Sequence, residues 1–433
     1  MSSILTNNGA MVALQTLKTI NTNLSNTQEE ISTGKRVATA KDNSAVWAIA
    51  KVMDADVKGF KGISDSLNLG QSTVSVARQA AETVTDLLTD IKGKIVAAQE
   101  ENVDRDKIQA DINALRDQIS AVVGAAQFNG LNLLSNTEQT AGSGQINILA
   151  SLDRSGTGVT ASDITVGKQD LGTGDSSIGA ALTALAAGAN DVSGFGDAAA
   201  AALTGAAAAP SGTTTFGAAS TDTVAAGTGF SIEISATAGN GPANTTGRNE
   251  IKYVARDGDT MADVAAGLAL QFNKYMKADL GADNVGTIDA TASGNQLSFT
   301  GIDNVGDNFS VTVQQYAADA TTTIGGRLAD LSDVDVTTQA GANSALDDIE
   351  GVLQTAIDSA AAFGSAQGRI ETQADFVSGL TDALKSGIGA LVDADMEEAS
   401  ARLQALQVQQ QLGVQALSIA NRAPQSLLSL FQG

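Results

Sequence analysis

Residues 49–98 read IAKVMDADVKGFKGISDSLNLGQSTVSVARQAAETVTDLLTDIKGKIVAA, and their apolar residues recur in alternating steps of four and three. Of the fifteen positions from Ile49 to Ala98, thirteen are apolar, and the exceptions are Asp56 and Gly70. A repeat of 3.5 residues is typical of a coiled-coil seam. At about 1.5 Å per residue, a helix of this length spans roughly 75 Å. We therefore predict a long helix that must bury its stripe against another helix.

The same repeat occurs on both sides of this run. It continues at 108–122 and returns at 346–391, and it then slips by one residue and runs on through 392–420. Near the N-terminus, apolar residues seven apart mark another helix, with two more beside them: Leu17, Leu24 and Ile31, flanked by Leu14 and Ile20. Because a single helix cannot bury such a stripe, we expect the two ends of the chain to pack together.

The middle of the chain has a different pattern. Residues 136–225 are rich in Ala, Gly, Thr and Ser, which favours loops and short strands. Four segments within 228–317 alternate like strands: GFSIEISA, NEIKYVA, NQLSFTG and NFSVTVQQY. Between them, TMADVAAGLALQFNKYM predicts a helix with Thr260 and Asp263 in capping-box positions. The predicted fold is mainly α, with long antiparallel helical, coiled-coil domains built from both termini and a β-rich α+β insert between them.

Composition excludes several function classes. The chain has no cysteine and no histidine, which removes Ser-His-Asp and Cys-His catalysis and any His- or Cys-ligated metal site. A net charge of −23 disfavours nucleic acid and anionic membrane as partners. No apolar run is long enough for a membrane span, and the N-terminus lacks the pattern of a cleaved secretory signal. No cofactor is expected.

Two structural interpretations of the heptads remain open. The runs at 49–122 and 346–391 can satisfy each other within one molecule, as an ordinary helical bundle. The terminal runs carry Ala, Gly and Gln at seam positions, which favours segments that complete their packing against other copies. Among the acidic residues, Asp330, Asp333 and Asp335 and the pair Asp303 and Asp307 do not match an EF-hand loop, so we interpret them as solvated loop carboxylates.

Both ends of the chain then resemble one family. Residues 31–37 read ISTGKRV, followed by AKDN at 40–43 and AIA at 48–50, and the stretches IQADINALRDQIS and AQFNGLNLL start at 108 and 126. The C-terminus reads VDADMEEASARLQALQVQQQLGVQALSIANRAPQSLLSLFQG from 392 to 433. These segments resemble bacterial flagellin, the subunit of the flagellar filament, over about 1–135 and 341–433. Trp47 and the SLLSLFQG ending look most like alphaproteobacterial members.

The resemblance implies a domain plan. Residues 1–40 and 392–433 would form an inner filament-core domain, and 41–135 and 341–391 an outer helical domain, with 136–340 as a variable surface insert folded at about 228–317. A polar spoke would join the first two helices, with these residues in it: Gly34, Arg36, Lys41, Asp42, Asn43 and Trp47. The apolar residues expected to drive filament-core assembly are Leu14, Leu17, Leu24, Ile31, Met396, Leu403, Leu406, Leu417, Leu427, Leu430 and Phe431.

Some members of the family are recognised by a vertebrate innate-immune receptor through an Arg, Glu and Leu patch on the first outer helix. The matching stretch here is LLTDIKGKIVAAQ at 87–99. Asp90, Gly93 and Lys94 stand where Arg, Glu and Leu are expected, so the resemblance implies weak recognition or none.

The function implied is a structural subunit, exported through the flagellar secretion channel, that polymerises outside the cell into the filament used for swimming. The implied partners are other copies of the chain, the export apparatus and a chaperone, and the cap and hook–filament junction proteins. The alternative is another axial flagellar protein, such as the hook–filament junction subunit. A third class, an enzyme, is disfavoured because the protease found in some flagellin inserts needs an HExxH zinc site. An Asp/Glu-only hydrolase in 228–317 is the one enzymatic reading left.

Overall fold

A computed structural model describes residues 7–155, 158–180, 182–185, 200–204, 210–238, 242–280, 288–301 and 308–431. The chain divides into two compact units. The first contains residues 1–65, 151–160 and 374–433, and the second contains 66–150 and 161–373. The helices α2 (Ser44–Ala97) and α5 (Gln339–Val392) contribute residues to both units. The predicted mainly α fold with terminal helices and a β-rich insert is confirmed.

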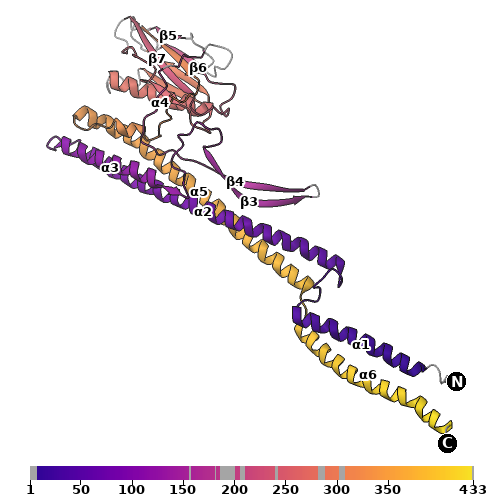
Figure 1. Cartoon of the computed structure of the whole chain (residues 1–433). Coiled ribbons are helices and arrows are strands. Elements are labelled where there is room, and N and C mark those ends of the chain that lie inside the picture. Colours follow the sequence, from indigo (N-terminus) through magenta and orange to yellow (C-terminus); the bar gives the residue numbers. More distant parts are fainter. Residues whose placement is uncertain are drawn as a thin grey trace. The chain divides into compact units, whose positions relative to one another are not determined.

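The first unit pairs the two ends of the chain. Helix α1 (Asn8–Thr33) lies antiparallel to α6 (Met396–Phe431), side by side with it in Figure 1. Asn7 caps the start of α1 by accepting a hydrogen bond from the amide of Ala10, and its own amide group donates to the carbonyl of Ala420. The one-residue slip in the heptad pattern has a structural cause, because α5 ends at Val392 and α6 begins a new register at Met396.

In the second unit α2 and α5 are also antiparallel. Arg78 donates to Gln367 and Gln99 donates to the carbonyl of Ala342, so rising numbers on α2 meet falling numbers on α5. Every predicted seam position from 63 to 98 is buried, namely Ile63, Leu67, Gly70, Val74, Ala77, Ala81, Val84, Leu88, Ile91, Ile95 and Ala98. Each buried large aliphatic side chain contributes about 1.5–3 kcal/mol through loss of water contact.

Helix α3 (Arg105–Ala125) packs back along this pair. Asp104 caps its start by accepting a hydrogen bond from the amide of Lys107, and Lys94 of α2 pairs with Asp111 at 2.5 Å. A short hairpin follows, β1 (Gln127–Phe128) and β2 (Leu131–Asn132), whose turn places Asn129 and Gly130 at positive φ. Asn-Gly is the pair that such a two-residue turn favours. A longer hairpin, β3 (Gln145–Ser155) and β4 (Gly158–Gly167), comes next.

The insert is an α+β fold around one apolar core. One antiparallel sheet has the order β5-β11-β7-β8 and another has the order β6-β10-β9. The strands are β5 (Ala200–Thr204), β6 (Ser211–Thr215), β7 (Gly229–Ala238), β8 (Lys252–Val254), β9 (Asp289–Ser293), β10 (Gln296–Thr300) and β11 (Asn308–Tyr316). Helix α4 (Met261–Leu280) packs on them, and in Figure 1 it lies beside the sheets.

The predicted alternation located the insert strands well. Four of the strands, β7, β8, β10 and β11, and the helix α4 fall where the pattern placed them, and Thr260 and Asp263 form the predicted capping box. The Ala- and Gly-rich region also supplies β5 and β6, whose Leu203 and Thr214 are buried. The sequence pattern predicted these two strands only weakly, because most of their residues are small and differ little in hydrophobicity between the two faces of the strand.

Two connectors join the insert to the helices, and they run against each other. Ser177 and Thr323 exchange backbone hydrogen bonds of 2.9 and 2.8 Å, and Gly326 donates to the carbonyl of Gly174. A Cβ built on Gly326 would lie 1.8 Å from the carbonyl oxygen of Gly172, so only glycine fits there. A short 3-10 helix, η3 (Ala329–Ser332), leads on to α5.

Candidate assembly surface

The polar stretch after α1 reverses the chain and ties it to the end of α5. Gly34 is the C-cap of α1 with φ +67°, a left-handed conformation that glycine adopts at little cost. Lys35 forms a backbone bridge with Asp393, and the amide of Arg36 donates to the carbonyl of Val392 at 2.7 Å. The Arg36 side chain adds a hydrogen bond of 2.9 Å to the carbonyl of Leu391.

The second half of the stretch starts α2. Asp42 accepts hydrogen bonds from the amides of Ala38 and Thr39 and from the Thr39 hydroxyl. The hydrogen bond from the Thr39 amide lowers the pKa of this exposed carboxyl. The side chain of Asn43 accepts from the amide of Val46, and its carbonyl accepts from the amide of Trp47, which makes Asn43 the N-cap of α2. Lys41 is exposed.

Trp47 lies in a small apolar cluster at this junction. The cluster has Val37, Ala50 and Val392 at its centre, and Val46, Trp47, Ile388 and Leu391 pack around them. Three parts of the sequence therefore meet in it: the spoke, the start of α2 and the end of α5. Of the six predicted spoke residues, five make contacts in this connection and Lys41 lies exposed within it; the five are Gly34, Arg36, Asp42, Asn43 and Trp47.

Most of the predicted core residues face one another between α1 and α6. Leu406 is 8% exposed, and the others are partly buried. A Cβ on Gly413 would lie 3.2 Å from the Leu17 side chain, so the two helices approach closely there. Asn21 and Gln410 bond across the seam at 2.7 Å. The predicted residues in this seam are Leu17, Leu24, Ile31, Leu403, Leu406 and Leu417.

Other predicted residues lie away from this seam. Leu14 is 58% exposed and Met396 is 43% exposed, and Met11 and Val12 beside Leu14 are exposed as well. The backbone of Leu427, Leu430 and Phe431 continues α6, but their side chains lie outside the part that the structure describes.

Helix α6 also has a second apolar stripe, which the sequence pattern did not predict. Val408 is 56% exposed, Leu412 58% and Ile419 70%. Together with Ala401, Ala405 and Ala416, which are also exposed, they occupy the side of the helix opposite the seam. In the sequence, this stripe is a second repeat of about 3.5 residues, offset from the repeat that forms the seam. It indicates a binding surface only when the seam side of α6 is known to be covered by α1. We call these six residues the outer stripe of α6.

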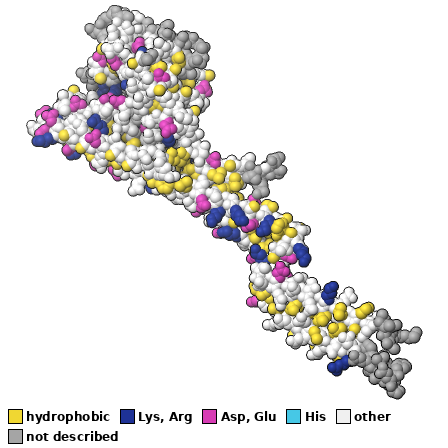
Figure 2. All heavy atoms as spheres, viewed as in Figure 1, with side chains coloured by type: hydrophobic (Ala, Val, Ile, Leu, Met, Phe, Trp, Pro, Cys, Tyr) yellow, Lys and Arg dark blue, Asp and Glu magenta, His cyan; other side chains and the backbone are white. Residues whose placement is uncertain are grey.

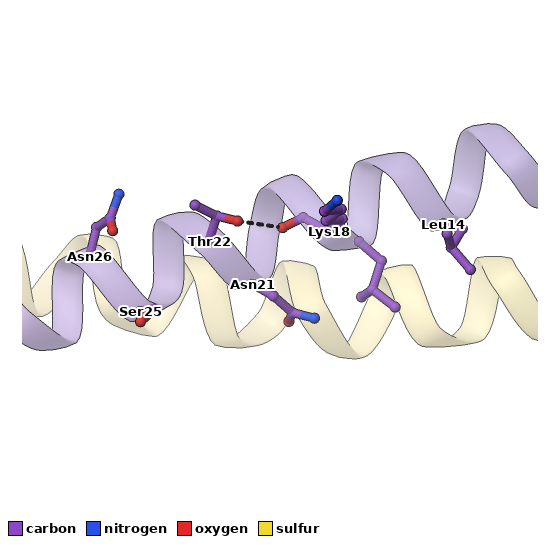
Figure 3. A pocket seen from close by; sticks show the side chains of 7 residues that line it. Leu14, Lys18, Asn21, Thr22, Ser25 and Asn26 are labelled. Atoms are coloured by element: carbon purple, nitrogen blue, oxygen red, sulfur yellow. Dashed lines mark hydrogen bonds between the residues drawn. The ribbon is translucent and has the colours of Figure 1, made fainter.

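Helix α1 carries a shallow groove of about 540 Å³. Figure 3 shows its side chains along α1, with α6 behind them. A hydrogen bond from the Thr22 hydroxyl to the carbonyl of Lys18 keeps that side chain close to the helix. The groove is lined by Leu14, Leu17, Lys18, Asn21, Thr22, Ser25 and Asn26.

Charge is almost absent from the longest stretch of each of these helices. Residues 403–421 of α6 contain no charged residue, and in α1 the residues from Asn8 to Gln28 contain one, Lys18. Figure 2 shows the corresponding surface as mostly yellow and white. Because removing charge from water is costly, an uncharged surface with exposed apolar side chains is the type that can be buried on association.

The remaining sequence candidates are placed elsewhere. Asp90 and Gly93 are exposed on α2, and Lys94 pairs with Asp111. Among the acidic residues considered for calcium, Asp330 and Asp333 bind the ammonium of Lys274 at 2.6 and 2.7 Å. Asp335 accepts a hydrogen bond from the amide of Thr337. Asp303 and Asp307 lie outside the described residues. Within the described ranges, no group of three or more acidic side chains is arranged to hold a metal ion. In that same part of the chain, every helix is too short or too polar to cross a bilayer.

Comparisons with known proteins match both ends and the whole length. The model of the bacterial flagellin N-terminal helical region matches residues 4–139, and that of the C-terminal helical region matches 346–431. Flagellin A of Rhizobium meliloti is 34% identical over 436 residues, covering 100% of both chains. Flagellin FljO of Caulobacter vibrioides is 28% identical and covers 100% of this chain and 99% of its own. A crystal structure of Xanthomonas campestris FlgL covers 78% of this chain and 99% of its own at 13% identity and a TM-score of 0.34, too low to support a conclusion.

Proposed function

Since this chain belongs to the bacterial flagellin family, in its alphaproteobacterial branch, and is a structural subunit of the flagellar filament that serves motility, we propose that copies assemble through the outer stripe of α6 and the groove of α1. Self-association into a filament is what the family does. The proposal concerns which side chains become buried. It rests on one observation: after α1 and α6 have paired within one copy, α6 still exposes Val408, Leu412 and Ile419.

The two surfaces suit each other physically. The outer stripe is apolar and uncharged, and the groove of α1 adds Leu14 and Leu17 with small polar side chains around them. Burying a few hundred Å² of such surface yields about 5 kcal/mol or more at roughly 25 cal/mol per Å². Association has its own entropic cost, so each contact is weak and a subunit needs several neighbours. The surfaces differ from each other, and such heterologous contacts generate open helical filaments rather than closed dimers.

The experiment compares charge insertion on and off the stripe. Val408→Asp and Leu412→Asp place a carboxylate on the outer stripe without touching the seam with α1. We expect monomers with wild-type helix content that form no filaments in electron micrographs and no fast-sedimenting polymer. The matched control is Ser378→Asp, an exposed position on α5, which should polymerise normally. Normal filaments from both stripe variants would overturn the assignment of this surface.

The finer cellular roles follow from family membership. We propose that the chain is exported unfolded through the flagellar export apparatus with a chaperone and polymerises at the distal tip beneath a cap, on the hook–filament junction proteins. The extracellular filament is its place of action. Full-length flagellin relatives support the filament subunit over the junction subunit. Counting copies tests this, because a filament subunit must be present in great excess over a junction protein. We propose no catalytic role.

A further inference from the structure

The exposed side of α2 carries opposite charges in its two halves. Positions opposite the buried seam recur every seven residues, and they read Lys51, Lys58, Asp65, Ser72, Gln79, Asp86 and Gly93. We define a basic face by exposed residues of the first unit, namely Lys51, Val52, Ala55, Lys58 and Lys61. We define an acidic face by exposed residues of the second unit, namely Glu82, Asp86, Asp90, Gly93 and Val96.

The basic face is a local exception on an acidic protein. The chain as a whole has a net charge of −23. Lys58 is 77% exposed and reaches Asp54 at 3.5 Å, whereas Lys51 and Lys61 make no ion pair within the described residues. Figure 2 shows dark-blue side chains gathered over the first part of α2 and the end of α5. Asp54 and the exposed Asp65 lie on the same side of the helix, so three lysines against two carboxylates leave this face with a small net positive charge.

The acidic face has the opposite character. Asp86 and Asp90 lie one helical turn apart, where like charges repel by a few tenths of a kcal/mol. Neither has an ion-pair partner among the residues that the structure describes, although Glu82 is paired with Arg78. Val96 is 51% exposed beside them, and a Cβ on Gly93 would meet nothing within 4 Å. Among the described residues, Asp86 and Asp90 thus form a repulsive surface beside an exposed valine.

We propose that the basic face of one copy docks on the acidic face of another copy in the filament. This rests on the proposed function, and it adds a second contact, distinct from the outer stripe of α6. The basic face carries an excess of lysine beside Val52, and the acidic face carries Asp86 and Asp90 beside Val96, so the two are opposite in charge and both expose apolar surface. Because they lie at different places on the same helix, the contact is head-to-tail and propagates from copy to copy.

Another copy is the occupant that the charges favour. Three lysines within the eleven residues 51–61, interleaved with apolar side chains and two aspartates, are too few for a nucleic-acid surface. In a homopolymer, the acidic face of a neighbour is present at the highest local concentration. Complementary charges at such a contact steer association and fix its register, and they weaken as salt screens them over about 10 Å at 0.1 M.

The test is a charge swap on the full-length chain. In Lys51→Glu/Lys58→Glu both faces are acidic, and in Asp86→Lys/Asp90→Lys both are basic. At low NaCl, we expect filaments of each variant alone to elongate at least tenfold more slowly than wild-type filaments. Added NaCl should reduce this difference in elongation rate. An equimolar mixture of the two, and the quadruple variant, should recover to within about threefold of wild type. The control pair Lys385→Glu and Asp382→Lys, an exposed pair on α5, should have little effect.

The outcomes separate this contact from the outer stripe. Helix content by circular dichroism checks that every variant folds. Recovery in the mixture and in the quadruple variant supports the contact, because a folding defect would not be rescued by a second defective chain. The proposal is overturned if the double variants elongate like wild type, or if the mixture and the quadruple variant stay as slow as their parents. Loss of polymer in Leu412→Asp together with unaffected charge variants would leave the outer stripe standing and remove only this inference.

Discussion

The guanidinium of Arg36 donates a hydrogen bond of 2.9 Å to the backbone carbonyl of Leu391, which lies 355 residues further along the chain. With the backbone bridge between Lys35 and Asp393, it closes the connection between α1, α2, α5 and α6. Gly34 makes this possible, since it turns the chain out of α1 in a left-handed conformation.

The first prediction concerns this turn. Gly34→Ala should lower the free energy of unfolding by about 1 kcal/mol, because a Cβ disfavours the conformation at φ +67°. Gly379→Ala is the matched control, since it lies inside α5 with open space around it and should raise stability by about 0.5–1 kcal/mol. Chemical denaturation of the monomer measures both. A stabilising Gly34→Ala would contradict the role of this glycine.

The second prediction concerns the seam between α1 and α6. Leu403→Asp or Leu417→Asp should leave a soluble, partly folded monomer that does not polymerise, because a carboxylate would replace a partly buried apolar side chain between the two helices. Hydrogen exchange should show fast exchange confined to α1 and α6. These variants differ from Leu412→Asp, which should retain the protection of the seam. Normal filaments from either variant in an electron micrograph would refute the prediction.

A third prediction addresses the buried ion pair beneath the insert. Arg256 binds Asp170 at 2.9 Å, with their side chains 9% and 1% exposed, and also donates to the carbonyl of Gly325. Asp170→Asn should lower stability by about 3 kcal/mol, because a buried guanidinium loses its counter-charge. Asp382→Asn, from an exposed pair, should cost less than about 1 kcal/mol. Denaturant midpoints at constant slope give both values, and equal costs would show that burial is irrelevant here.

The fourth prediction uses Asp348 on α5. Burial raises the pKa of this carboxyl above its usual 3.8, against the opposing effect of Lys277 and Lys274. A raised folded pKa means that the ionised form costs stability, and the cost disappears as the pH falls through the folded pKa. Asp348→Asn should therefore stabilise the monomer at neutral pH, and the gain should shrink toward pH 4. Asp358→Asn, at an exposed residue of α5, is the control; a gain for Asp348→Asn that is independent of pH would contradict this.

A fifth prediction concerns immune recognition. The family resemblance implies that Asp90, Gly93 and Lys94 stand where the recognised pattern has Arg, Glu and Leu, and Lys94 forms an ion pair with Asp111. We expect a receptor-reporter assay to give weak activation or none, and Asp90→Arg/Gly93→Glu/Lys94→Leu to increase it. Activation by the wild-type chain as strong as by an enterobacterial filament would show that these positions do not decide recognition.

Helical periodicity predicted the long elements because burial of a seam repeats with the helix itself. The stripe from Ile63 to Ala98 and the strand at Asn308–Tyr316 could be located from their patterns. The strands β5 and β6 could not, since Ala, Gly and Thr leave too little contrast between the two faces of a strand. The ion pair between Arg256 and Asp170 joins distant segments, which no local pattern reveals.

By itself, the sequence determined which residues form the helices, that both ends carry apolar stripes, and which family the chain belongs to. Only the tertiary structure decided which stripe is used within one copy and which is left over. Helix α6 is apolar on opposite sides, and either side could have met α1. Leu406 became buried and Leu412 remained exposed because two helices can share only one line of contact, and the other side of α6 stays in water until another molecule covers it.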